Sequence, residues 1–119
     1  MLGRYRVAGV HIAVGSTDLR KSINGLSIIV QESFGLDPFN HCLYVFCNRN
    51  RDKLKILHWE ESGFWLYYKR LEKGTFKWPS RTNESGSLVV SERELNWLLD
   101  GLKLEQNTAH KPVTERYIV

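Results

Sequence analysis

The sequence predicts a single α+β domain in which two helices pack on an antiparallel β-meander sheet. The main observation is a row of three apolar-aromatic runs of six to eight residues, Cys42–Cys47, Leu54–Trp59 and Phe64–Leu71. Their Val, Ile, Tyr, Phe and Trp content favours strands over helices. The break Glu60–Gly63 has the length of a hairpin turn, and the break Asn48–Lys53 is a longer, basic loop.

Two stretches have the apolar spacing of helices. The first helix is expected over residues 18–34, where apolar side chains recur every three or four residues and Gly35 provides a stop. Ser16, Thr17 or Asp18 could each cap its start. The second helix is expected over residues 91–102, because Ser91 and Glu94 form a capping box before a leucine stripe.

Shorter strands are expected around the meander, which gives a sheet of four to six strands. Val7–Val14 and Ser87–Val90 are candidates, and residues 73–78 resemble an edge strand with lysines outward and aromatics inward. The domain is expected to span residues 1–102. Residues 103–119 lose periodicity and are expected to form a flexible C-terminal tail.

Size and composition indicate an ordinary globular domain. The chain has 119 residues, 42% of them hydrophobic, with no apolar run of the ~18 residues that a membrane span needs. The N-terminus has no signal-peptide core, so we expect a cytoplasmic protein without membrane contact. Cys42 and Cys47 fall on opposite faces of one expected strand, too far apart for a disulfide, so both are expected to be reduced.

The positive charge is concentrated in one part of the chain. Residues 49–81 hold nine basic and four acidic side chains, an excess of +5, while the remainder holds eight basic and nine acidic ones, or −1. Such a patch suits phosphate backbones or an acidic protein surface. A solvated basic face without a partner explains the same charge.

The sequence offers little for catalysis. No phosphate-binding glycine motif, zinc spacing or catalytic set is present, so neither a cofactor nor a metal is expected, and the protein is predicted not to be an enzyme. The alternative is a small metal-dependent nuclease centred on His58, Glu60 and Glu61. The simpler interpretation is a strand histidine beside two solvated turn carboxylates.

A series of short motifs is similar to one known family. They are Thr17-Asp18-Leu19-Arg20-Lys21-Ser22 with Asn24-Gly25-Leu26, Leu43-Tyr44-Val45-Phe46 with Asn48-Arg49 and Arg51-Asp52, Lys55, Trp59, Gly63-Phe64, and Lys69-Arg70-Leu71-Glu72 with Gly74, Phe76 and Trp78-Pro79. Together they resemble the small TnpB-type accessory protein of bacterial insertion sequence family sixty-six, which differs from the RNA-guided nucleases of the same name. The likeness covers roughly residues 10–101. Leu19 replaces a frequent methionine and Asn24 a frequent aspartate.

The resemblance implies a role in DNA transposition beside a larger transposase that carries the catalytic acidic residues. We therefore hypothesise a non-catalytic accessory protein that binds DNA at the element ends, the partner transposase, or both. A purely structural interaction module that meets an acidic protein without DNA contact is a further alternative. The oligomeric state is not predicted. The candidate DNA- or partner-binding residues are Arg20, Lys21, Arg49, Arg51, Lys69 and Arg70.

Overall fold

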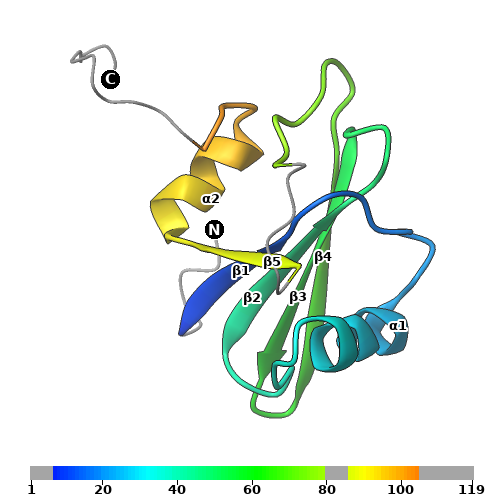
Figure 1. Ribbon diagram of the computed structural model, residues 1–119, viewed down its shortest axis with the longest axis vertical. Coiled ribbons are helices and arrows are strands. Elements are labelled where there is room, and N and C mark those ends of the chain that lie inside the picture. Colours follow the sequence, from blue (N-terminus) through cyan, green and yellow to red (C-terminus); the bar gives the residue numbers. More distant parts are fainter. Residues whose placement is uncertain (1–6, 80–85, 105–119) are drawn as a thin grey trace.

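The computed structural model describes residues 7–79 and 86–104, which form a five-stranded sheet with a helix on either side (Figure 1). The chain order is β1 (Gly9–Ala13), α1 (Ile23–Ile28), the π-helix η1 (Ile29–Ser33), β2 (Cys42–Cys47), β3 (Lys53–Glu60), β4 (Gly63–Arg70), β5 (Ser87–Val90) and α2 (Glu92–Leu99). The predicted α+β class with an antiparallel meander and two helices is confirmed.

The strands lie in the order β4-β3-β2-β1-β5. β2, β3 and β4 form the meander, and β5 pairs antiparallel with β1. β1 is parallel to β2, which requires a crossover, and α1 and η1 lie within that connection. β2 is the central strand of the sheet, and the basic loop that begins at Asn48 connects it to β3.

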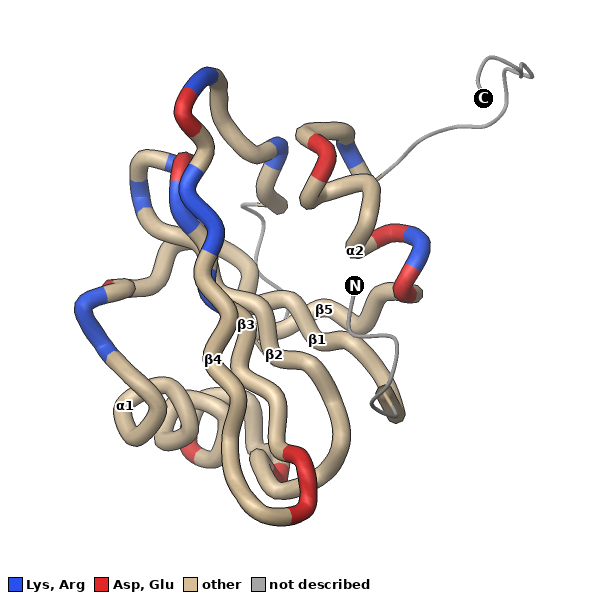
Figure 2. Tube along the Cα trace, turned by 180° about the vertical axis from the view of Figure 1, so that it is seen from behind, with Lys and Arg blue, Asp and Glu red and all other residues tan. Residues whose placement is uncertain are grey.

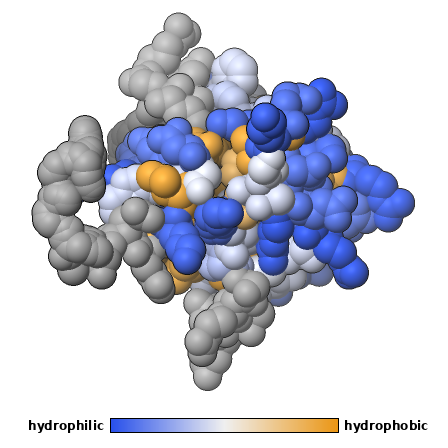
Figure 3. Space-filling model, turned by 90° about the horizontal axis from the view of Figure 1, so that it is seen from above, coloured by the Kyte–Doolittle hydropathy of each residue, from blue (hydrophilic) through white to orange (hydrophobic). Residues whose placement is uncertain are grey.

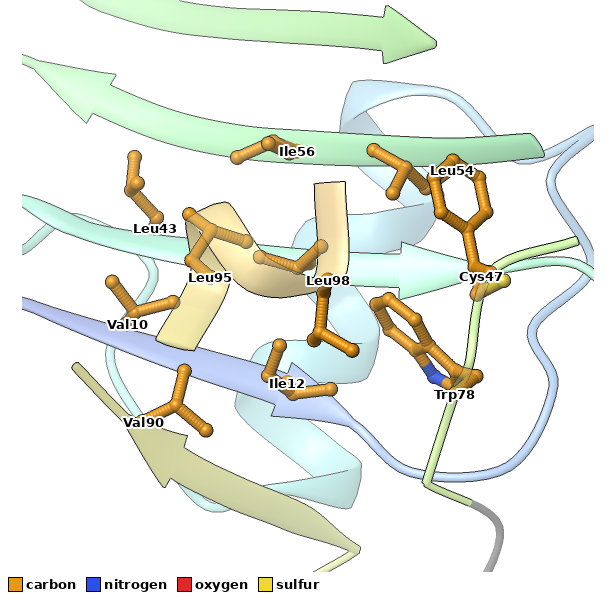
Figure 4. Close-up of a cluster of buried hydrophobic side chains, with 12 residues drawn as sticks. Val10, Ile12, Leu43, Cys47, Leu54, Ile56, Trp78, Val90, Leu95 and Leu98 are labelled. Atoms are coloured by element: carbon orange, nitrogen blue, oxygen red, sulfur yellow. The ribbon is translucent and has the colours of Figure 1, made fainter. Parts of the chain in front are cut away.

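One face of the sheet packs against α2. Leu95 and Leu98 from α2 meet strand residues such as Ile12, Leu43 and Ile56, and all of them are almost completely buried (Figure 4). α2 begins where the sequence predicts, because Ser91 and Glu94 form the reciprocal capping box. This cluster is the larger of the two cores.

The opposite face packs against α1 and the η1 turn that continues it. Leu26 and Val30 cover Tyr44, Phe46 and Leu57, which alternate along their strands with the residues of the first core. Cys42 belongs to this cluster and Cys47 to the other, and both thiols are free. The expected placement of the two cysteines on opposite faces is confirmed.

The first helix starts later than the sequence predicts. Residues 18–22 form an irregular turn, Ser22 is the N-cap, and its side chain makes no capping hydrogen bond. The prediction of a helix from residue 18, with a cap among Ser16, Thr17 and Asp18, is wrong. Gly35 does end the helical segment, with a φ of +67° that favours glycine.

The edge strand predicted over residues 73–78 is also wrong. This segment crosses the α2 face as irregular chain, although Phe76 and Trp78 are buried as expected. The Phe76 amide donates to the Arg51 carbonyl at 2.7 Å, and the Trp78 indole donates to the Ala13 carbonyl at 2.8 Å. The segment is thus fixed by the first core and by the basic loop instead of by a neighbouring strand.

In the described part of the chain, no helical segment has the length and apolar character that a membrane crossing requires. Most of the tail predicted over residues 103–119 lies outside the described residues, which end at Leu104.

Candidate nucleic-acid interface

The β3–β4 hairpin has opposite charges at its two ends. At the open end Lys53 of β3 lies opposite Arg70 of β4, whereas Glu60 and Glu61 lie at the turn. Glu60 lies seven residue steps along the strand from Lys53, or roughly 23 Å away. Figure 2 shows the Lys and Arg positions of these strands gathered at one end, where a few acidic positions lie among them, and acidic positions alone at the turn. We call the positive end, with the loops beside it, the basic end.

A surface depression of about 690 Å³ lies at the basic end. It combines four cations, one carboxylate, several amide and hydroxyl groups and one aromatic ring. Viewed onto this end, hydrophilic residues form a broad area beside a smaller hydrophobic one (Figure 3). The lining residues are Ser16, Thr17, Asp18, Leu19, Arg20, Asn48, Arg49, Asn50, Lys53, Lys55 and Tyr68.

Lys55 fixes one wall of the depression. Its ammonium group donates to the carbonyl oxygens of Leu19 at 2.7 Å and Lys21 at 3.1 Å. These contacts tie the turn before α1 to strand β3, more than thirty residues away in sequence. They place Arg20 near Arg49 and Asn50 of the β2–β3 loop, which line the same depression.

Asp18 and Arg20 form a two-pronged ion pair at the rim. Arg20 Nε lies 3.0 Å from Asp18 Oδ1, and Arg20 NH2 lies 2.8 Å from Oδ2. The hydrogen bonds from Arg20 hold the pKa of Asp18 well below its usual range, so the carboxylate stays charged. Because the Arg20 side chain is 91% exposed, the pair contributes little to stability and leaves the guanidinium accessible.

Lys21 and Arg49 are two further exposed cations on this side of the sheet. The stem of Lys21 lies over Gly25 of α1, where an added Cβ would come within 3.0 Å of Lys21 Cβ. Gly25 thus leaves room for this lysine beside the helix. Among residues 7–79 and 86–104, neither the Lys21 ammonium nor the Arg49 guanidinium has an ion-pair partner within 4.0 Å.

Arg51 points into the protein. It adopts a φ of +63° in the β2–β3 loop, and its guanidinium donates to the Gly15 carbonyl at 3.0 Å. It also interacts with the Cys47 thiol, whose pKa burial raises to about 11. The structure therefore shows Arg51 holding two loops together.

Lys69 and Arg70 are adjacent in sequence and lie on opposite faces of the sheet. Lys69 is on the α2 side, where its ammonium group donates to the Leu99 carbonyl at the end of α2 at 3.0 Å. That contact suits the negative end of the helix dipole. Arg70 is on the α1 side with Lys53 and pairs with Glu72 at 2.8 Å.

The six predicted residues thus occupy different environments. Arg20, Lys21, Arg49 and Arg70 are exposed at the basic end on the α1 side, and these four form what we call the basic surface. Arg51 and Lys69 bind backbone carbonyls. Lys53, Lys55 and Tyr68 also line the depression, although none of the three was predicted from the sequence as a binding residue. The strand alternation shared by Lys53 and Lys55 could have shown that both face the same side.

The groups of the hypothetical nuclease site do not form a metal site. His58 is completely buried on β3, and Glu60 and Glu61 lie at the hairpin turn. Across residues 7–79 and 86–104, no three His, Cys, Asp or Glu side chains are grouped as metal ligands.

Sequence comparison assigns the chain to a family. The profile of the family described as IS66 Orf2 like protein (TnpB_IS66) matches residues 8–109. The chain belongs to the IS66 Orf2-like family. This confirms the likeness expected from the motifs, and membership supports an accessory role in insertion-sequence transposition.

Two relatives of this IS66 Orf2-like protein come from Sinorhizobium fredii (strain NBRC 101917 / NGR234). The protein y4hO is 39% identical over 93 residues, covering 78% of this chain and 79% of its own. The protein y4jC is 32% identical over 102 residues, covering 86% of each. Both carry the description uncharacterized protein. No solved structure matches the chain.

Proposed function

We propose that this IS66 Orf2-like protein is a non-catalytic accessory factor that binds the DNA of its element through the basic surface. The observation that carries the proposal is the position of Arg20, Lys21, Arg49 and Arg70 on one side of the basic end, with Glu60 and Glu61 at the far end of the hairpin. Such a one-sided field attracts a polyanion and orients it on approach.

The chemistry of the depression fits phosphate and sugar contacts better than base-specific readout. Arginine guanidinium groups bind phosphate oxygens in a fork, and hydroxyl and amide groups such as Thr17 and Asn50 can add further donors. Tyr68 is 54% exposed on the depression wall, where its ring could stack on an unpaired base. Binding dominated by phosphates is strongly weakened by salt.

The test is binding of the purified protein to duplex DNA from the terminal inverted repeats, followed by fluorescence anisotropy across a salt series. Affinity that falls steeply as salt increases is the expected result. Absent or salt-independent binding would contradict the proposal.

The larger transposase is the second proposed partner, as the transposition role of the family suggests. Reversing the charge of Arg49 separates the two partners. Arg49→Glu should weaken DNA binding, while co-purification with the transposase should persist if that protein uses another surface. Loss of transposase binding alone would favour an acidic protein surface as the ligand of the basic surface.

A further inference from the structure

Strand β4 leaves one long side of the sheet unpaired by any described strand. It stands at the end of the strand order, and its eight residues pair on one side only, with β3. The register with β3 continues through all eight pairs without a bulge, and the strand GFWLYYKR contains no proline. Bulges and prolines are usual means of preventing edge strands from pairing with another chain.

The side chains of β4 are also unusually accessible. None of its eight residues is buried, whereas all six residues of β2 are. Trp65 is 42% exposed on the α2 side, and Tyr68 is 54% exposed on the α1 side. β5, the other edge strand, has only four residues and leads directly into α2. β4 is therefore the edge that offers backbone groups and aromatic surface together.

The charge pattern of the hairpin indicates which strand could pair with β4. Glu60 and Glu61 precede the strand, and Lys69 and Arg70 end it. A second β4 in antiparallel orientation brings the acidic end of each copy to the basic end of the other. A parallel orientation would place like charges side by side, which is unfavourable across strands.

We propose that two copies of this chain pair through β4 in antiparallel orientation, joining two five-stranded sheets into one. The twofold axis lies perpendicular to the joined sheet, so residue contacts are reciprocal. The turn that carries Glu60 and Glu61 in each copy then lies at the same end of the joined sheet as Lys69 and Arg70 of the other, with Glu60 one strand further from the partner because it belongs to β3. The α1 sides of both copies, and with them both basic surfaces, then face the same direction. The proposal does not depend on DNA binding.

The first measurement is the mass of the full chain in solution by analytical ultracentrifugation over a concentration series, without DNA. The expected mass is twice the 13.9 kDa of one chain. Two variants test the interface itself. Glu60→Lys/Glu61→Lys makes both ends positive, and Arg70→Glu reverses one of the two positive charges at the other end of β4, so each variant alone should sediment as a monomer.

Mixing the two variants provides the decisive result. In a mixed pair, the new lysines of one copy lie at the same end of the joined sheet as the new glutamate of the other, and the unchanged Arg70 lies at the same end as the unchanged glutamates. An equimolar mixture should therefore regain the dimer mass. Arg93→Glu, an exposed charge reversal on α2, is the matched control and should stay dimeric.

Circular dichroism of each variant confirms that it is folded. A wild-type mass of 13.9 kDa at every concentration would overturn the proposal. It would also be overturned by folded variants that remain dimeric, or by a mixture that stays monomeric. Because no DNA is present, none of these outcomes bears on the proposed DNA binding.

Discussion

Arg49 and Arg51 are two residues apart in the same loop, and the structure predicts opposite consequences for replacing them with alanine. The Arg49 side chain is exposed on the basic surface. Arg51 is partly buried and donates to the Gly15 carbonyl at 3.0 Å. We expect Arg49→Ala to change DNA binding and Arg51→Ala to change stability.

The size of the first effect follows from counterion release. Each neutralised phosphate contributes about 0.9 to the slope of log Kobs against log salt. Four contacts, one for each cation of the basic surface, give a slope of about −3.6, and three give about −2.7. Raising salt from about 50 to 200 mM then weakens wild-type binding about 150-fold and Arg49→Ala binding about 40-fold.

The second effect follows from a lost hydrogen bond. Arg51→Ala removes a donor to the Gly15 carbonyl and should lower the free energy of unfolding by about 1–3 kcal/mol. Its salt slope should match that of the wild type. Anisotropy titrations give the slopes, and urea denaturation gives the stabilities. The reasoning is refuted if Arg51→Ala flattens the slope as much as Arg49→Ala while unfolding at the wild-type urea concentration.

Three further predictions concern the fold. Ser91→Ala breaks the capping box of α2 and should cost about 1 kcal/mol in urea denaturation, whereas an unchanged midpoint would contradict the cap. Trp78→Phe leaves the Ala13 carbonyl without its indole donor and should cost about 1–3 kcal/mol, and a neutral result would show that this bond does not stabilise the segment. Burial raises the pKa of Cys47 from 9.0 to about 11, so its protonated form favours folding and this stability should be lost as pH rises from 9 to 11. Stability that increases over that interval would contradict the assignment.

The strands of the fold could be predicted because their apolar runs are continuous and their alternation is regular. β2 shows this well, since all six of its residues are buried and successive side chains enter opposite cores. The second helix could be predicted because a capping box is local chemistry between Ser91 and Glu94. In both cases residues close together in the sequence are enough to predict the element.

The errors arose where distant residues decide the conformation. An apolar stripe does not show that Lys55 will hold the carbonyls of Leu19 and Lys21, which keeps residues 18–22 out of α1. The alternation of residues 73–78 correctly gave the buried Phe76 and Trp78, but it could not show that no strand lies alongside them.

The candidate site was also predicted only in part, because contacts between distant residues decide which cations are exposed. Composition located the charge in the right part of the chain, because the basic loop and the open end of the β3–β4 hairpin meet in space. Composition could not distinguish exposed Arg49 from Arg51, which binds a carbonyl, or show that Lys69 and Arg70 point to opposite faces. Those differences depend on loop geometry and strand register.

The central claim is that DNA lies on the basic surface. Backbone amide shifts in a ¹H–¹⁵N spectrum, recorded while terminal inverted-repeat DNA is added, test it most directly. We expect changes concentrated at residues 18–21, 49–55 and 68–70, with smaller changes at the hairpin turn of Glu60 and Glu61. Saturable changes centred on that turn, with none at the basic end, would contradict it.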